Sequence, residues 1–378
     1  MSGFVFSEKP ITIESGEGAT LTSDDGTEYL DFGASYACTP LGHDHPDVTE
    51  AIQAQAAELT YVQASYPTDV RTETYEKLAH LAPGDVDNVW LCNSGTEANE
   101  AAMKFARSAT DSTKIVATKR AFHGRTMGAL ALTWKQKYKA PFEPLASGVE
   151  FVEYGDSEEL AEVVDDDTAA VFLEPVQGEG GIHPADVAYL EDAREITDEE
   201  DAALVFDEIQ TGLGRTGTLW ACEQAGVTPD ILTTAKGVAN GLPMGATLCA
   251  DWIAADPGDH GSTFSGGPVV CAAANATLDA VVEEDLPAHA AEVGEYLQDS
   301  LTEAVEDHDL PVREVRGEGL MIGVEVKRGA NRVLRDLAVS EQVLALPAGR
   351  TVVRLLPPLI IEQEHADAFV DAFVEVLS

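Results

Sequence analysis

The sequence predicts an α/β protein in which a large domain with a mainly parallel sheet is joined to a smaller α+β domain. Two observations predict this class. Short, continuously apolar runs alternate with helical patterns through the middle of the chain, and alternating strands appear after about residue 285. The 378 residues are enough for two or three domains. We expect an N-terminal segment at 1–45 that packs with the small domain, a large domain at 46–285 and a small domain at 286–378.

Five apolar runs predict the strands of the large domain. They are too short for buried helices, and they are too continuously apolar for strands with one face exposed to solvent. Such runs are typical of a parallel sheet that helices cover on both sides. Ligands bind such sheets at the carboxyl ends of the strands, where Glu174, Asp207 and Glu208 stand. The runs occupy residues 89–92, 114–117, 169–176, 203–209 and 230–233.

The two ends of the chain have a different pattern. A charged helical stretch at 287–307 precedes predicted strands at 311–316, 320–327 and 351–355, and a last helix begins at Glu364. Residues 1–45 also contain short strands, with a turn at Asp24-Asp25-Gly26. Runs of strands followed by helices favour a separate α+β unit.

The charge balance excludes several classes of function. The chain has 67 acidic and 23 basic side chains, so its formal net charge is −44. We expect no binding to nucleic acid or to an anionic membrane, because phosphates would be repelled. Only 10 of the 23 cations are lysines, and the acids are spread along the chain. This composition predicts a halophilic protein, in which salt screens the self-repulsion.

Several simpler features limit the cellular location and the chemistry that we expect of the protein. No apolar run is long enough to span a membrane, and residues 1–18 lack the pattern of a secretory signal, so we expect a cytoplasmic protein. The five cysteines contain no C-x-x-C pair, which predicts buried free thiols. We expect no metal site, because His43 and His45 supply only two nitrogens in a loop flanked by proline.

A glycine motif at residues 212–217 fits the dinucleotide pattern G-x-G-x-x-G. In a dinucleotide site the first glycine follows the strand directly. Here residues 207–211 intervene, and Asp207 and Glu208 would stand where anionic phosphates should bind. We therefore reject the nucleotide interpretation.

Residues 93–100 open a strong helix pattern that runs to about Ala109. Ser94 and Glu97 have the spacing of a capping box. The free N–H groups of Gly95 and Thr96 would equally suit a phosphate, because a helix N-terminus attracts anions. The motif alone leaves both interpretations open.

Lys236 follows the run at 230–233 in a small, uncharged neighbourhood. An exposed loop lysine is the plainer interpretation, but a desolvated lysine becomes a nucleophile that forms Schiff bases. Asp207 lies near the end of another predicted strand, 29 residues earlier. Pyridoxal phosphate requires a lysine that bonds to its aldehyde carbon and an acid that protonates its pyridine nitrogen. We therefore favour a pyridoxal phosphate site.

Six motifs then identify a family resemblance. In their order and spacing they resemble the class III aminotransferases, enzymes of the aspartate aminotransferase-like fold, which is fold type I of the pyridoxal phosphate enzymes. The resemblance covers nearly the whole chain and is greatest to acetylornithine aminotransferases, in particular to the branch acting on lysine or ornithine held by an acidic amino-group carrier protein. The motifs are SGTEANEAAMKFAR, AFHGRT, EPVQGEGG, FDEIQTGLGRTG, TTAKG and GSTFSGGP.

The resemblance implies a role for each matching residue around the cofactor. Lys236 would form the Schiff base and then move the proton, and Asp207 would pair with the pyridinium nitrogen. Thr263 would reach the phosphate in the neighbouring subunit, which implies a homodimer with shared active sites. The remaining cofactor contacts would come from Gln210 at the phenolic oxygen, Gly95 and Thr96 at the phosphate, and Phe122 on the ring.

The resemblance also implies the substrate contacts. Arg125 would bind a substrate carboxylate, and Ser262 would touch the substrate. Glu179 would neutralise Arg354 while an ω-amine donor is bound and swing away when 2-oxoglutarate enters. We expect His123 to form part of the pocket wall, because Lys236 already supplies the base.

Together these features predict an ω-aminotransferase of arginine or lysine biosynthesis. It would transfer the terminal amino group of N-acetylornithine, or of carrier-linked lysine or ornithine, to 2-oxoglutarate, reversibly giving the semialdehyde and glutamate. The sequence leaves the acetylated and the carrier-linked donor open. The alternatives are a 4-aminobutyrate aminotransferase, a glutamate-semialdehyde aminomutase and a non-catalytic cofactor-binding regulator.

Overall fold

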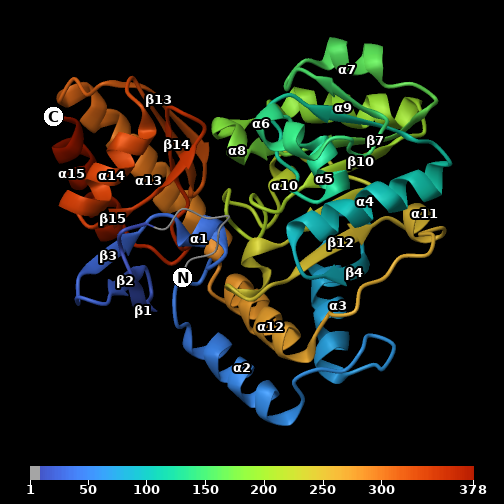
Figure 1. Cartoon of the computed structure of the whole chain (residues 1–378), viewed down its shortest axis with the longest axis horizontal. Coiled ribbons are helices and arrows are strands. Elements are labelled where there is room, and N and C mark those ends of the chain that lie inside the picture. The colour runs from blue at the N-terminus through green and yellow to red at the C-terminus, as the bar shows by residue number, and fades with distance from the viewer. Residues whose placement is uncertain (1–8) are drawn as a thin grey trace.

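The computed structural model describes residues 9–378. The first eight residues of the predicted N-terminal segment lie outside the described residues. They include the start of residues 1–18, which lack the pattern of a secretory signal. Figure 1 shows two parts side by side, one built around a large sheet and one formed by the C-terminal elements together with the N-terminal strands. Within residues 9–378, no helix is long and apolar enough to cross a bilayer.

The large sheet has seven strands in the order β4-β12-β11-β10-β7-β5-β6. All neighbouring pairs are parallel except those of β12, which runs antiparallel to β4 and β11. The class predicted from the sequence, α/β with a mainly parallel sheet, is confirmed. The strands are β4 (Asn88–Cys92), β5 (Lys114–Thr118), β6 (Val149–Val152), β7 (Thr168–Leu173), β10 (Ala203–Asp207), β11 (Ile231–Thr234) and β12 (Gly245–Cys249).

The five predicted runs coincide with five of these strands, and β6 and β12 were not predicted. The edge strand β6 exposes or half-exposes three of its four residues, so its apolar signal is weak. β12 begins with Gly245 and Ala246, which are poor strand formers. Two predicted runs were also too long: β7 ends at Leu173 before Pro175, and β10 ends at Asp207.

Helices cover both faces of the sheet, as the apolar runs predicted. Along β10, Val205 packs in a cluster with Phe105 of α4, whereas Leu204 and Phe206 pack in the main core with Leu190 of α9. Every residue of β10 is therefore buried. The longer helices of this part are α2 (Pro46–Glu58), α3 (Asp69–Leu81), α4 (Gly95–Thr110), α7 (Ser157–Val163), α9 (Val187–Glu199) and α12 (Pro268–Glu283).

Shorter elements connect these strands and helices. They are α1 (Ala34–Ala37), α5 (Met127–Leu132), α6 (Gln136–Lys139), η1 (Ala140–Phe142), β8 (Val176–Gln177), α8 (Gly178–Gly181), β9 (His183–Pro184), α10 (Cys222–Ala225), η2 (Lys236–Ala239) and α11 (Asp251–Ala254).

The C-terminal part has an antiparallel sheet in the order β13-β14-β17-β16, together with three helices. β15 leaves this part to pair in parallel with β3, whose own neighbours are β2 and β1. The elements are β1 (Ile13–Glu17), β2 (Thr20–Ser23), β3 (Glu28–Asp31), α13 (Leu286–Asp307), β13 (Val312–Glu318), β14 (Met321–Val326), α14 (Ala330–Ser340), β15 (Val343–Leu344), β16 (Leu346–Ala348), β17 (Val352–Leu355) and α15 (Gln363–Leu377).

Candidate functional site

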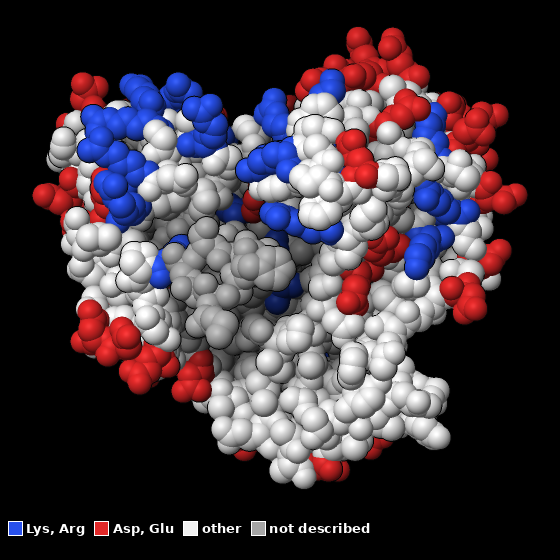
Figure 2. All heavy atoms as spheres, viewed as in Figure 1, with Lys and Arg blue, Asp and Glu red and all other residues white. Residues whose placement is uncertain are grey.

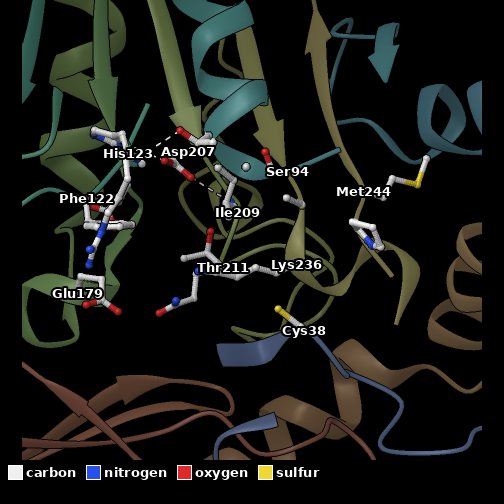
Figure 3. Close-up of a pocket in the computed structure, with 18 of the residues that line it drawn as sticks. Cys38, Ser94, Phe122, His123, Glu179, Asp207, Ile209, Thr211, Lys236 and Met244 are labelled. Carbon is white, nitrogen blue, oxygen red and sulfur yellow. Dashed lines mark hydrogen bonds and ion pairs between the residues drawn. The ribbon is translucent and has the colours of Figure 1, made fainter. Parts of the chain in front are cut away.

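A cavity of about 460 Å³ opens at the carboxyl edge of the large sheet. This volume is within the range of small-ligand sites. Figure 3 shows its labelled side chains converging from several segments: Cys38 beyond α1, Ser94 before α4, Glu179 on α8, Asp207 at the end of β10 and Lys236 on η2. The predicted position of the site at the strand ends therefore agrees with the cavity.

Lys236 follows β11 and lines the cavity. Burial lowers the pKa of its ammonium group, and the positive charge of Arg354 lowers it further, against weaker opposing effects of Cys38, Glu179 and Asp207. Its backbone has a φ of +42°, a conformation that costs energy for a residue with a side chain. The surrounding structure thus holds an amine that loses its proton readily, as a nucleophile requires.

Asp207 is 5% exposed and both of its oxygens are occupied by protein groups. Oδ2 accepts a hydrogen bond from Asn99 Nδ2 at 2.8 Å and lies 2.7 Å from His123 Nδ1. Oδ1 accepts the Ile209 N–H at 3.1 Å. Asn99 is itself fixed, because its Oδ1 accepts the Thr233 hydroxyl at 2.9 Å. This network fixes the carboxylate at the edge of the cavity.

His123 is 2% exposed and packs behind Asp207. Burial disfavours its charged form, but the hydrogen bond to Asp207 and the negative charge of that residue raise the pKa of the imidazole. His123 also lines the cavity, as expected for a wall residue. The sequence did not reveal that it pairs with Asp207, since 84 positions separate them.

The N-terminus of α4 forms another side of the cavity. Ser94 caps the helix, because its Oγ accepts the Glu97 N–H at 3.3 Å. The returning bond of the predicted capping box is absent: Glu97 Oε2 accepts from the Asn93 N–H at 2.9 Å instead. Within the described residues, the N–H groups of Gly95 and Thr96 have no acceptor. A Cβ on Gly95 would lie 2.7 Å from Ile209, so only glycine keeps this approach open.

At the other end of the cavity, Glu179 and Arg354 form an ion pair, with 2.7 Å between Oε1 and Nη2. Arg354 Nη1 also donates to Gln210 Oε1 at 3.1 Å. Arg354 is fully buried and does not line the cavity, whereas both of its partners do. Burial opposes the charge of Glu179, but the Arg354 guanidinium lowers the pKa of its carboxyl.

Phe122 and Arg125 stand together on the cavity wall. The guanidinium carbon of Arg125 lies 5.7 Å from the centroid of the Phe122 ring and 4.1 Å from that of Tyr138. Arg125 is exposed, so a carboxylate entering from solvent can reach it. The Phe122 N–H donates to Glu174 Oε2 at 3.1 Å, which fixes the backbone behind the ring.

Besides Arg354, two predicted site residues do not line this cavity. Ser262 and Thr263 line a separate hollow with residues 61–66. Ser262 touches the site only indirectly, because its Oγ accepts from Asn93 Nδ2 at 3.2 Å. Beside Thr263, Phe264 is 65% exposed. Within one chain, the structure therefore does not bring Thr263 to the phosphate end.

Sequence reasoning missed several residues of the site. Cys38 lines the cavity and is only half-buried, whereas the sequence predicted buried thiols. It follows the unusual turn α1, in which Ala34, Ser35, Tyr36 and Ala37 all have positive φ. No glycine marks this left-handed turn, so no sequence signal predicts it. The Asp31 carboxylate supports it by accepting the N–H groups of Gly33 and Ala34, each at 2.9 Å.

The arrangement fits the demands of pyridoxal phosphate. Lys236 supplies an amine for the aldehyde carbon, Asp207 a fixed carboxylate for the pyridine nitrogen, and the N–H groups of Gly95 and Thr96 a place for the phosphate. Fold and site together define a pyridoxal phosphate-dependent enzyme of fold type I. Residues 6–377 match the family described as aminotransferase class-III, and the chain belongs to this family.

Similar proteins agree with this assignment. The chain is 44% identical over 378 residues to a [LysW]-aminoadipate semialdehyde transaminase of Deinococcus radiodurans, covering 99% of this chain and 87% of that protein. It is 44% identical over 367 residues to an acetylornithine aminotransferase of Methanosarcina mazei, covering 97% and 91%. The structure of the ornithine aminotransferase from Toxoplasma gondii ME49 matches with a TM-score of 0.94 and 33% identity, covering 98% and 91%.

The predicted class of enzyme and its cofactor are thereby confirmed. The protein is a class III aminotransferase, and pyridoxal phosphate is its cofactor. The sequence analysis judged His43 and His45 insufficient for a metal site. In the structure, each of these two histidines lies beside one carboxylate. His43 Nε2 lies 2.9 Å from Asp31 Oδ2, and His45 Nε2 lies 3.8 Å from Glu284.

Proposed function

We propose that the enzyme transfers the terminal amino group of N-acetylornithine, or of lysine or ornithine linked to a carrier, to 2-oxoglutarate in arginine or lysine biosynthesis. The relatives support this, because they include acetylornithine aminotransferases and [LysW]-aminoadipate semialdehyde transaminases. The observation that carries the proposal is the Glu179–Arg354 ion pair beside Lys236. Such a pair lets one pocket serve an ω-amine and an α-amino acid.

When bound, pyridoxal phosphate supplies an electron sink and carries the amino group between the two substrates. We assign to Lys236 Nζ the covalent attachment and the proton transfer at the substrate carbon, because its pKa is lowered and it faces the cavity. Asp207, fixed by Asn99 and His123, keeps the pyridine nitrogen protonated. Gln210 is assigned to the phenolic oxygen of the cofactor.

The remaining cofactor contacts follow from the cavity walls. Gly95 and Thr96, which line the cavity, would donate backbone N–H groups to the phosphate, and Phe122 would stack on the ring. We assign Thr263 to the phosphate of a partner subunit, which makes the enzyme a homodimer with shared active sites. Its place outside the cavity of its own chain and the exposed Phe264 beside it support this.

Substrate selection follows from the two arginines. Arg125 holds the carboxylate distant from the reacting carbon, because it is exposed at the cavity wall. With an ω-amine donor in place, Glu179 neutralises Arg354, whose unpaired charge would be costly in a buried site. With 2-oxoglutarate, Glu179 swings away and Arg354 binds the α-carboxylate. Ser262 remains assigned to the substrate, in the active site of the assembled dimer.

Two alternatives share the cofactor site. A 4-aminobutyrate aminotransferase uses the same arginine pair, and a glutamate-semialdehyde aminomutase needs no external acceptor. The first alternative is tested by comparing kcat/KM for N-acetylornithine, carrier-linked lysine and 4-aminobutyrate in molar salt. Turnover that depends strictly on 2-oxoglutarate excludes the second. Preference for 4-aminobutyrate by kcat/KM, or turnover without an acceptor, would overturn our proposal.

Three broader properties belong to the same proposal. We divide the chain at residues 45 and 285, and the parallel pairing of β3 with β15 supports packing of the N-terminal segment with the small domain. We propose a halophilic enzyme on the strength of the net charge of −44. A cytoplasmic location fits its place in amino-acid biosynthesis.

A further inference from the structure

A strained turn lies beside the active site. The backbone of α1 closes as a helix does, because the N–H groups of Ala37 and Cys38 donate to the carbonyl oxygens of Gly33 and Ala34 at 3.1 and 2.7 Å. Its hand is the opposite one, since all four of its residues have φ between +38° and +66°. L-residues adopt this conformation singly, so four in succession without a glycine persist only where the surrounding structure holds them. The four residues are Ala34, Ser35, Tyr36 and Ala37.

Asp31, the buried last residue of β3, holds the start of the turn. Its Oδ1 accepts the N–H groups of Gly33 and Ala34, each at 2.9 Å. Its Oδ2 lies 2.9 Å from His43 Nε2, beyond the other end of the turn. A carboxylate in this position satisfies N–H groups that the first turn of a helix leaves free. Asp31 therefore fixes where the turn begins.

The chain after the turn is attached to the segment that contains Lys236. Asn240, which directly follows η2, accepts the Leu41 N–H with Oδ1 and donates from Nδ2 to the carbonyl oxygen of Gly42, both at 3.1 Å. The turn is thus held from both sides, by Asp31 before it and by Asn240 after it.

The turn lies where the two parts of the molecule meet. Figure 1 shows α1 between the C-terminal part and the large sheet part, and Figure 2 shows a hollow between these parts on the same face. The turn is followed by Cys38, which lines the cavity together with Lys236 (Figure 3). It also places the ring centroid of Tyr36 5.6 Å from the guanidinium carbon of Arg354 on β17. This distance is within the range of a cation–π attraction.

The Tyr36 ring is one of three contacts of the buried Arg354 guanidinium. Nη2 pairs with Glu179 at 2.7 Å, and Nη1 donates to Gln210 at 3.1 Å. When Glu179 swings away, as the proposed function requires, Gln210 and the Tyr36 ring remain. The ring then helps to keep the guanidinium in place for the incoming carboxylate, and its own place depends on the strained turn.

We propose that Asp31 is a positioning residue of the active site, because it holds the left-handed turn that keeps the Tyr36 ring on Arg354. This inference rests on the proposed function, in which Arg354 binds the α-carboxylate of 2-oxoglutarate. Asp31 acts through the backbone of the turn, and Tyr36 acts through the face of its ring. Loss of either contact should therefore weaken the binding of 2-oxoglutarate and leave the ω-amine donor almost unaffected.

Stopped-flow measurement of each half-reaction on the holoenzyme tests this role. Asp31→Ala should raise the half-saturation concentration for 2-oxoglutarate about tenfold, with little change in the limiting rate. The value for the ω-amine donor, whichever of N-acetylornithine and carrier-linked lysine the enzyme converts, should change by less than about twofold. Asp31→Asn keeps an oxygen for the two N–H groups and should restore the binding of 2-oxoglutarate.

Two variants of Tyr36 test the other end of the same connection. Tyr36→Leu removes the ring and should weaken 2-oxoglutarate binding as Asp31→Ala does. Tyr36→Phe keeps the ring and should restore the binding, because the face of the ring and not the hydroxyl makes the contact. These variants also decide the question if Asp31→Ala does not fold.

Alkylation of Cys38 reports on the turn without any turnover. Cys38 is half-buried and the four other cysteines are buried, so iodoacetamide should label Cys38 first. Mass spectrometry should show labelling of the holoenzyme about tenfold faster in Asp31→Ala, because the turn opens more often, and at the wild-type rate in Asp31→Asn. Asp25→Ala is the matched control: Asp25 Oδ1 also accepts an N–H, that of Thr27 at 3.0 Å, but in the β2–β3 hairpin. It should change neither measurement.

Four results would overturn the positioning role. They are unchanged 2-oxoglutarate binding in Asp31→Ala or in Tyr36→Leu, equal damage by Asp31→Ala and Asp31→Asn, equal damage by Tyr36→Leu and Tyr36→Phe, and wild-type labelling of Cys38 in Asp31→Ala. Arg354→Ala separates this inference from the proposed function. If that variant binds 2-oxoglutarate normally, the role of Arg354 is itself wrong and the inference falls with it. If it binds 2-oxoglutarate poorly and Asp31→Ala does not, only the positioning role is wrong.

Discussion

Arg354 Nη2 and Glu179 Oε1 lie 2.7 Å apart, and the arginine is completely buried while the glutamate reaches the cavity. The carboxylate therefore stands between the cavity and a strong cation. Lys135 fixes the backbone of Glu179 through its carbonyl oxygen at 2.7 Å, so a change of partner can be made by the side chain alone. Glu179 lies in the single helical turn α8.

Replacement of Lys236 should abolish catalysis. Lys236→Ala removes the amine that faces the cavity, and we expect loss of the visible cofactor absorbance together with transamination. Lys236→Arg keeps the charge but not the nucleophile, so it should fail equally. Lys77→Ala, on α3 away from the cavity, is the control and should keep the wild-type spectrum. Wild-type turnover in Lys236→Ala would exclude our assignment.

Much of this site was predicted from the sequence, because its chemistry stands at strand ends and at a helix start. Asp207 closes an apolar run, and Lys236 follows another. The rest depends on contacts between distant segments. Asn99 reaches Asp207 across 108 positions, and no local pattern predicts that contact. The position of Thr263 depends on a second chain, which the sequence of one chain describes only through family resemblance.

The half-buried Glu318, near the buried Glu208, predicts a pH-dependent stability. Burial raises the pKa of Glu318 to about 7, and the charge of Glu208 adds to this effect. Its folded pKa exceeds the unfolded value, so the folded state keeps a proton that the unfolded state loses. Stability therefore falls as the pH rises from about 4.5 to about 7.

Glu318→Gln should remove this loss. We expect the variant to gain about 1 kcal/mol at pH 8, a value reduced for the partial exposure of this side chain, and to gain nothing at pH 4.5. Denaturant unfolding at the two pH values measures the difference. Glu150→Gln on the exposed face of β6 changes the charge equally and should show no such pH dependence. A gain for Glu318→Gln that is the same at both pH values would show that charge is not its cause.

Salt should control the stability of the whole molecule. With a net charge of −44, self-repulsion grows as the screening distance lengthens from about 3 Å in 1 M salt to about 10 Å in 0.1 M. We expect a lower melting temperature and release of cofactor at the lower salt, followed by differential scanning fluorimetry and absorbance. Sucrose of equal osmolality is the control and should not restore stability. A melting temperature that does not depend on salt would contradict this explanation.

The last prediction concerns the Glu179–Arg354 pair as a gate between two substrates. In the closed arrangement, Arg354 is neutralised by Glu179 and also donates to Gln210 at 3.1 Å. An ω-amine donor places no carboxylate near the reacting carbon and leaves this pair intact. Glutamate or 2-oxoglutarate must displace Glu179 to gain Arg354. A static ion pair would instead affect both substrates alike.

Stopped-flow measurement of each half-reaction distinguishes a gate from a static pair. Arg354→Ala should slow the 2-oxoglutarate half-reaction by about 100-fold, because a buried carboxylate loses its charged partner, and should change the ω-amine half-reaction much less. Glu179→Ala should improve glutamate as a donor and weaken discrimination in favour of the ω-amine. Arg125→Ala is the matched comparison. Because a distal carboxylate is present in both half-reactions, this variant should slow both of them. Equal losses in the two halves for Arg354→Ala would mean that the pair is static and that another group selects the substrate.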